Sequence, residues 1–144
     1  MGKRRLAREY ALQTLYFADS GKVTAADIEQ YEKDFEDKLD ADSFAFCGAL
    51  VSGALENIKT LDGIIAKYAK NWSVTRMSVV DRAILRMAAY EMLFSKEDTP
   101  VPAVIDEAIE LAKKFSTENS SRFINGLLDQ IKKERENGQN QTGN

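Results

Sequence analysis

The sequence predicts an all-α protein, a bundle of about seven helices in two sub-bundles. Apolar residues recur at helical spacing rather than in the alternation typical of half-buried strands. The chain has only two prolines, Pro100 and Pro102, and both lie at a predicted helix entry, where a missing N–H costs nothing. Its 144 residues suffice for one domain with a sizeable core. The number of helices follows from the periodic segments and their capping signals.

The first predicted helix has two different sides. One side can dock closely on a core because it is made of mostly small residues: Ala7, Tyr10, Ala11, Thr14 and Ala18. Arg5, Arg8, Leu12 and Tyr16 fall within a narrow arc of the opposite side. Guanidinium groups bind phosphates and aromatic rings stack on unpaired bases, so this side suits single-stranded RNA. Periodicity alone equally allows a solvated basic N-terminus with Tyr16 packed in the core.

Charge is distributed unevenly along the chain. The formal net charge is −3, from 20 basic and 23 acidic residues. A basic run precedes the first acid, Glu9, and consists of Lys3, Arg4, Arg5 and Arg8. The stretch 19–42, which we place in the first sub-bundle, is dominated by acids: Asp27, Glu29, Glu32, Asp34, Glu36 and Asp37. A nucleic acid would therefore meet a polarised molecule rather than a uniformly basic one.

A central helix is predicted to begin after Ser78, where Ser78 and Asp81 form a weak capping box. It is apolar on most sides and should lie in the middle of the bundle. Arg82 and Arg86 share one side, and Glu91 faces nearly opposite. Because an unpaired buried charge is costly, Glu91 should pair with a basic group or cap another helix.

Two further residues are expected to serve the core. Cys47 lies between Phe46 and Gly48 in an apolar stretch, and a single cysteine cannot form an internal disulfide, so it is interpreted as a small core residue. Trp72 is interpreted as a core anchor at a helix junction.

The helix that follows the two prolines has one apolar face, made of Val104, Ile105, Ala108, Leu111, Ala112 and Phe115. Its acids lie toward its start and its lysines at its end, which matches the helix dipole and allows Glu110 to pair with Lys114. The cap-type residues Ser116, Thr117 and Asn119 predict a turn into a last helix. The buried stripe of that helix is expected to be Ile124, Leu127, Leu128 and Ile131.

Gly126 lies inside this last periodic run, where a glycine costs roughly 1 kcal/mol relative to alanine. Asn125-Gly126 would ordinarily indicate a turn, yet the apolar period continues through it. Close approach of a neighbouring helix is the favoured explanation. A backbone surface left open for RNA is the alternative.

Composition argues against catalysis. The chain has no histidine, one cysteine, and neither of the glycine-rich motifs that cradle phosphates, so we expect no enzymatic activity, no cofactor and no metal site. Asp106, Glu107 and Glu110 could chelate a hard cation, but acids at a helix start are usually solvated or matched to the dipole. No apolar run reaches the ~18 residues of a membrane span, and the start leads into a charged helix, so a cytoplasmic protein without membrane contact is expected.

Three segments carry a resemblance to a known family: 4–16 (RRLAREYALQTLY), 78–91 (SVVDRAILRMAAYE) and 98–131, from DTPVPAVIDEAIELAKKF through RFINGLLDQI. The chain resembles the NusB family of bacterial transcription antitermination factors, and the likeness weakens only across residues 21–42. The resemblance implies binding of boxA RNA from ribosomal RNA operon transcripts together with NusE, a small-subunit ribosomal protein. It also implies a place in an RNA polymerase antitermination complex with other Nus factors.

The resemblance also suggests site residues. RNA-binding candidates are the basic run, an aromatic residue of the first helix and the start of the last helix: Lys3, Arg4, Arg5, Arg8, Tyr16, Asn119, Ser120, Arg122 and Phe123. Leu6 departs from members with another arginine there, which would weaken the phosphate contacts. A structural role for Phe123 is as compatible with its position as stacking. Candidates for the protein partner are Arg76, Asp81 and Arg82.

Alternatives remain at this point. NusB-like domains also begin certain RNA cytosine methyltransferases, but that interpretation needs a cofactor-binding domain. A helical adaptor acting mainly through protein contacts is the second alternative, and a homodimer is possible because some family members self-associate. We expect the NusB-like domain to span residues 1–136 and the polar tail 137–144 to be disordered.

Overall fold

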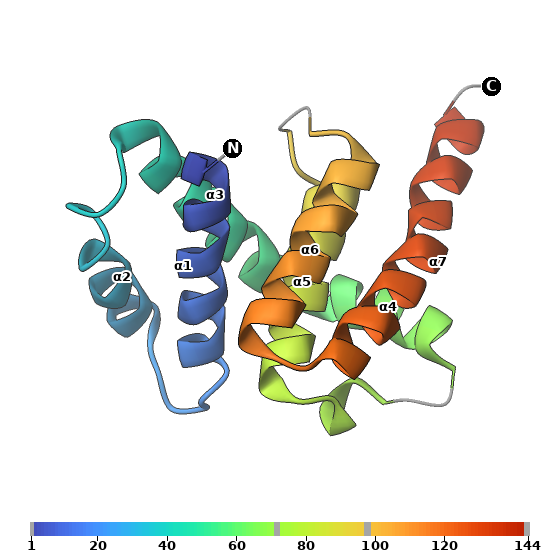
Figure 1. The fold of residues 1–144 in the computed structure, drawn as a ribbon, viewed down its shortest axis with the longest axis horizontal. Coiled ribbons are helices and arrows are strands. Elements are labelled where there is room, and N and C mark those ends of the chain that lie inside the picture. Colours follow the sequence, from blue (N-terminus) through green and yellow to red (C-terminus); the bar gives the residue numbers. More distant parts are fainter. Residues whose placement is uncertain (1, 71–72, 97–98, 143–144) are drawn as a thin grey trace.

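The computed structural model describes residues 2–70, 73–96 and 99–142, and in this part of the chain it contains seven α-helices and no strand (Figure 1). A short 3-10 helix, Val74–Arg76, precedes the fifth. The α-helices are α1 (Gly2–Ala18), α2 (Ala25–Lys33), α3 (Ala41–Glu56), α4 (Ile58–Ala69), α5 (Val79–Leu93), α6 (Val101–Phe115) and α7 (Glu118–Thr142). The all-α prediction is confirmed. Trp72 lies outside the described residues.

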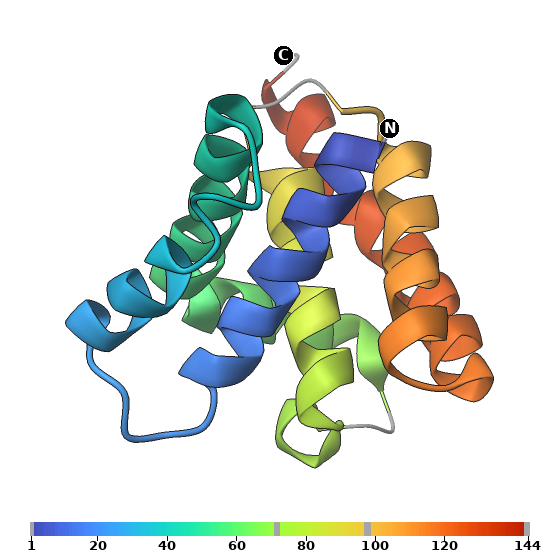
Figure 2. The same cartoon turned by 60° about the vertical axis from the view of Figure 1, so that its left-hand side comes forward.

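The helices form two groups that share α5. In the first group α1 packs against α2 and α3, and in the second α5 packs against α4, α6 and α7. Helices α1 and α3 also contact α5, which therefore joins the two groups (Figures 1 and 2). The predicted central position of α5 is confirmed, because it buries residues on most of its sides: Ala83, Ile84, Leu85, Met87, Ala88, Ala89 and Met92.

Hydroxyl and carboxylate caps start several of the helices. The backbone N–H of Asp81 donates to the Ser78 hydroxyl over 3.1 Å, and that of Ser120 donates to the Thr117 hydroxyl over 3.0 Å. These bonds satisfy N–H groups that have no partner inside the helix. The Asp81 carboxylate contacts the α6–α7 turn, so only one half of the predicted capping box is confirmed.

The apolar stripes of α6 and α7 are confirmed except at one end. Val104 through Ala112 are buried at the predicted positions of α6, and so are Ile124, Leu127, Leu128 and Ile131 of α7. Phe115 was predicted in the same stripe but is 36% exposed, because α6 ends there. The predicted Glu110–Lys114 pair is also wrong, since Lys114 pairs with Glu9 of α1 and Glu110 lies 3.9 Å from Lys113.

The close helix approach expected at Gly126 is found elsewhere. A Cβ atom added to Gly126 would meet nothing within 4 Å, so the explanation by a neighbouring helix is wrong. At Gly53 of α3, in contrast, an added Cβ would lie 2.1 Å from Cζ of Tyr90 of α5. The ring of Tyr90 therefore occupies the space that a side chain at Gly53 would need.

Three further predictions concern the single cysteine, the membrane and the C-terminal tail. Cys47 is buried, as predicted, and burial raises the pKa of its thiol to about 12. Among the described residues, every helix is too short or too polar to cross a membrane. Helix α7 continues to Thr142. The domain boundary at residue 136 and the disordered tail remain predictions.

Candidate nucleic-acid and protein interface

Each cation of the basic run pairs with an acid from another element. Lys3 Nζ lies 3.1 Å from Asp40 Oδ2, and Arg4 Nη2 lies 3.5 Å from Asp42 Oδ2, at the start of α3. The side chains of Lys3, Arg4 and Arg5 remain 81%, 37% and 48% exposed. Three cations at the start of α1 are therefore accessible to a ligand, although none of them carries an uncompensated charge.

Arg8 is the exception to this accessibility. Its Nε donates to Glu91 Oε1 over 3.0 Å and its Nη2 to Glu91 Oε2 over 2.5 Å, and only 6% of the Arg8 side chain is exposed. The guanidinium also lies 5.0 Å from the centroid of the Phe46 ring. The prediction that Glu91 pairs with a basic group is confirmed. The exposed position predicted for Arg8 and Leu12 is wrong, because α3 and α5 cover this side of α1 as well.

Ion pairs also bridge α1 to α6. Arg5 donates from Nε and Nη2 to the two oxygens of Glu107, each over 3.0 Å, and Lys114 pairs with Glu9. The hydrogen bonds from Arg5 lower the pKa of the Glu107 carboxyl. At the other side of α1, the Ser43 backbone N–H and Lys3 together lower the pKa of Asp40 to about 2. Ion pairs thus attach the start of α1 to the start of α3 on one side and to α6 on the other.

A groove lies between the second half of α1, the start of α5 and the end of α6. The groove has a volume of about 320 Å³, and the described residues that line it are uncharged: Leu12, Gln13, Tyr16, Tyr31, Val80 and Phe115. Tyr16 is 52% exposed, which contradicts the alternative of a tyrosine packed in the core. We call this surface the Tyr16 groove.

The α6–α7 turn brings together residues of both predicted sets. Asp81 accepts hydrogen bonds from the hydroxyls of Ser116 and Ser120, each over 2.8 Å, and so fixes the turn to α5. A pocket of about 240 Å³ lies beside it and is lined by Arg76, Met77, Ser78, Asp81, Asn119, Ser120 and Phe123. Asn119 and Arg122 are exposed, whereas Phe123 is half-buried and packs against the core. We call this surface the turn pocket.

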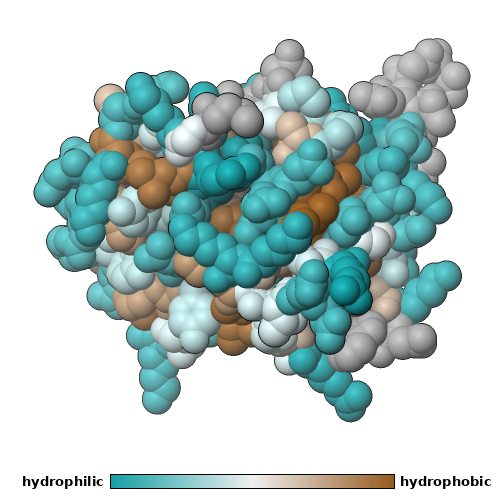
Figure 3. Space-filling view, in the orientation of Figure 1, coloured by the Kyte–Doolittle hydropathy of each residue, from teal (hydrophilic) through white to brown (hydrophobic). Residues whose placement is uncertain are grey.

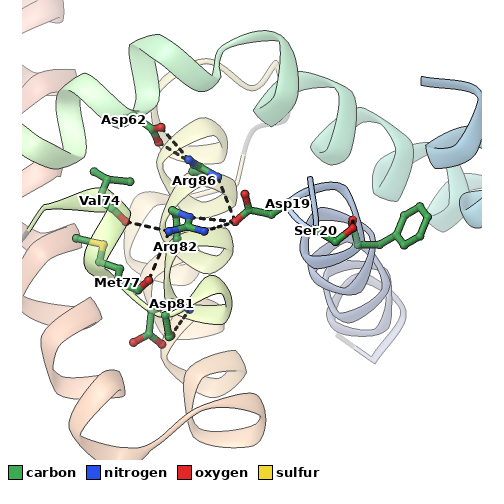
Figure 4. A network of polar contacts seen from close by, with 10 residues as sticks. Asp19, Ser20, Asp62, Val74, Met77, Asp81, Arg82 and Arg86 are labelled. Atoms are coloured by element: carbon green, nitrogen blue, oxygen red, sulfur yellow. Dashed lines mark hydrogen bonds and ion pairs between the residues drawn. The ribbon is translucent and has the colours of Figure 1, made fainter. Parts of the chain in front are cut away.

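Two of the three predicted partner residues, Asp81 and Arg82, form hydrogen bonds within the protein. Asp81 is only 9% exposed and its carboxylate is occupied by the two serines. Arg82 donates to Asp19 from Nε over 3.0 Å and from Nη2 over 2.5 Å, and to the carbonyl of Val74 over 3.2 Å (Figure 4). Both residues lie at the start of α5, as predicted, but packed neighbours cover most of their side chains. Arg76 is exposed, as expected of an interface residue.

Arg86 extends this network and fixes α5 to its neighbouring helices. It forms two hydrogen bonds with the Asp62 carboxylate of α4, over 2.7 and 2.8 Å, and lies 3.8 Å from Asp19 (Figure 4). The predicted common side of Arg82 and Arg86 is confirmed. Together the two arginines join the end of α1, helix α4 and the 3-10 turn to α5.

Hydrophilic residues dominate the face that shows α1, α6 and α7, with apolar patches between them (Figure 3). Sequence reasoning missed the acids that restrain this face, Asp40, Asp42 and Glu107. The residue types were visible, but only the packing of α1 between α3 and α6 shows that they lie opposite the basic run. It also missed Phe115 as a wall of the Tyr16 groove.

Comparisons with known proteins place this chain in one family. The NusB family model matches residues 5–133. Transcription antitermination protein NusB of Elusimicrobium minutum (strain Pei191) is 74% identical over 140 residues, which cover 97% of this chain and all of that protein. Its counterpart in Bacillus subtilis (strain 168) is 44% identical, covering 93% of this chain and 98% of that protein.

Solved structures agree. Thermotoga maritima NusB superposes with a TM-score of 0.82 at 40% identity, over 91% of each chain. A crystal structure of antitermination factors NusB and NusE in complex with dsRNA superposes with a TM-score of 0.80 at 29% identity, over 92% of this chain and 98% of the matched chain. The chain belongs to the NusB family.

Proposed function

We propose that this protein is a transcription antitermination factor that binds boxA RNA of ribosomal RNA operon transcripts together with NusE. It would act within an RNA polymerase antitermination complex that contains other Nus factors, and therefore in the cytoplasm. The observation that carries the proposal is the 74% identity to a transcription antitermination protein NusB over that protein's whole length. We further propose that it acts by binding alone, with no catalytic step and no cofactor.

The RNA surface that we propose combines the accessible cations of α1 with the start of α7. Lys3, Arg4 and Arg5 would contact phosphates, since their pairs with acids are exposed and can exchange in water. Asn119, Ser120, Arg122 and Phe123 would contact bases and sugars from the turn pocket. The related complex of NusB and NusE with dsRNA supports an RNA role for this fold. Arg8 is left out, because its guanidinium is buried against Glu91.

The Tyr16 groove is the surface that we assign to NusE, together with the exposed Arg76. Its described lining is uncharged and contains two exposed aromatic rings, those of Tyr16 and Phe115. Aromatic residues concentrate at protein interfaces, whereas a groove for RNA needs cations along the backbone path. Base stacking on Tyr16 is the competing prediction, and one variant separates the two.

That variant is Tyr16→Ala, measured with labelled boxA RNA in the absence and presence of NusE. We expect RNA binding by the protein alone to be nearly unchanged and the cooperative gain from NusE to fall at least tenfold. Truncating an aromatic residue at the centre of an interface typically costs about 2 kcal/mol or more. Phe123→Ala, at the turn pocket, is the matched control and should reduce RNA binding in both conditions.

Two outcomes would contradict the assignment. Weaker RNA binding of Tyr16→Ala without NusE, at an unchanged melting temperature, would return Tyr16 to the RNA surface. A wild-type protein that prefers neither boxA RNA nor NusE would refute the function itself and favour a helical adaptor or a homodimer. Methyltransferase activity of the purified chain would overturn the proposal of binding without catalysis.

A further inference from the structure

We propose that Glu107 limits the RNA affinity of this protein by competing with RNA phosphate for Arg5. The inference rests on the proposed function, because it concerns how tightly the start of α1 binds RNA. Glu107, on α6, would not itself bind the RNA. It would act by holding Arg5, a cation that we propose binds phosphate.

The geometry of the pair supports direct competition. Arg5 offers Nε and Nη2, one edge of its guanidinium, and both atoms donate to Glu107 over 3.0 Å. Carboxylate and phosphate oxygens accept from this fork in the same parallel arrangement. A phosphate that bound Arg5 through this edge would therefore have to displace Glu107.

Glu107 is better placed to hold its cation than the acids that pair with Lys3 and Arg4. Its side chain is 16% exposed, whereas those of Asp40 and Asp42 are 41% and 85% exposed. It also forms two hydrogen bonds with Arg5, each over 3.0 Å. Arg5 is consequently paired with a less exposed acid than Lys3 is, and its release should cost more than that of Lys3.

The surroundings of the pair add repulsion for an incoming phosphate. Arg5 borders a pocket of about 190 Å³ whose lining includes the carboxylates of Glu9, Glu107 and Glu110. Lys114 neutralises Glu9, and Lys113 lies 3.9 Å from Glu110. Glu107 is the carboxylate of this pocket that pairs with Arg5, through two hydrogen bonds. Once phosphate took Arg5, Glu107 would be left beside it without that partner.

Glu107→Gln tests the proposal, because glutamine keeps the volume and one acceptor but loses the charge. We expect boxA RNA to bind about two- to fivefold more tightly, the range that corresponds to a partly exposed ion pair. The gain should vanish in the double variant Arg5→Ala/Glu107→Gln, since no cation remains to be released. Arg5→Ala alone should weaken binding and reduce the slope of log affinity against log salt by about 0.7.

Glu110→Gln is the matched control. Glu110 lies on the same helix three residues further on, and its side chain is 51% exposed. The substitution removes the same charge near Arg5 without removing a hydrogen bond to it. It therefore measures how much any lost negative charge helps RNA to bind, and Glu107→Gln must exceed it.

The experiment uses the full chain and a fluorescein-labelled single-stranded boxA RNA, with a scrambled RNA beside it, titrated at two salt concentrations. Melting temperatures within a few degrees of wild type show that the variants are folded. Equal effects of Glu107→Gln and Glu110→Gln, or weaker binding by Glu107→Gln, would overturn the inference while leaving the proposed function intact. A wild-type protein that binds boxA and scrambled RNA equally would instead refute the proposed function, and this inference with it.

Discussion

Arg5 and Arg8 lie about one turn apart on α1, and each donates two hydrogen bonds to a glutamate that is distant in the sequence. The Arg5–Glu107 pair faces water, with 48% of the arginine side chain exposed, whereas the Arg8–Glu91 pair lies inside the bundle, with 6% exposed. Chemistry and local geometry are almost the same in the two pairs. Burial alone separates them.

This difference divides stability from recognition on one helix. An exposed pair contributes little to folding, since water and salt screen it, and its cation can be given to a ligand. Separating a buried ion pair costs more free energy than separating an exposed one, because it leaves a desolvated charge without a partner. The basic run therefore contains two kinds of arginine: Arg5, which is accessible to solvent and which we propose binds RNA, and Arg8, which holds α1 against α5.

The largest effect is expected for Arg8→Ala. It leaves Glu91 buried without its partner, which should lower the free energy of unfolding by about 3–5 kcal/mol. The midpoint of thermal unfolding should fall by about 10 °C or more, whereas Arg5→Ala, the matched control, should leave it nearly unchanged. Circular dichroism melts of the two variants measure both.

A double variant sharpens this test. Arg8→Met/Glu91→Leu removes both charges and should recover most of the stability that Arg8→Ala loses, because no buried charge is left unpaired. The comparison would fail if Arg8→Ala and Arg5→Ala melted at the same temperature.

A second, smaller effect compares two glycines, one beside a packed ring and one facing open space. Gly53→Ala places a methyl group 2.1 Å from Cζ of Tyr90, so the ring must shift, at a cost of about 1–3 kcal/mol. Gly126→Ala meets nothing within 4 Å and should stabilise α7 by roughly 1 kcal/mol, the gain in helix propensity. Urea unfolding of the two variants checks the opposite signs.

Gly126→Ala also tests the remaining explanation for this glycine. We expect boxA RNA to bind it as it binds wild type, since the added methyl group points into open space. A loss of RNA binding in a folded and stabilised variant would mean that RNA approaches the backbone here, and would extend the RNA surface along α7.

The smallest effect concerns the exposed pair Lys3–Asp40 and appears only in acid. The pKa of Asp40 is lowered from 3.8 to about 2, through its hydrogen bonds from the Ser43 backbone and from Lys3. A lowered folded-state pKa contributes stability that is present above about pH 4 and is lost as the pH falls toward 2. Asp40→Asn should therefore melt at a temperature that depends less on pH between 4.5 and 2.5. Identical pH profiles for the variant and wild type would exclude a contribution from this pair.

The sequence by itself determined the features that depend on neighbours a few positions away. Caps at Ser78 and Thr117 and the apolar stripe of α7 appear where the periodicity predicts them, because a helix brings residues three and four apart onto one face. The burial of Cys47 and the need of Glu91 for a cation also followed, since both rest on the cost of transfer out of water.

The tertiary structure alone decided which of these residues face solvent. Periodicity gives the angle of a side chain around its helix but not how much of the circumference other helices cover, and on α1 the cover extends to Arg8 and Leu12. The partners of Arg5 and Arg8 lie 102 and 83 residues away in the chain. Nothing local links such distant positions, so the restraint on Arg5 arises only when the packing of the whole bundle sets α1 beside α6.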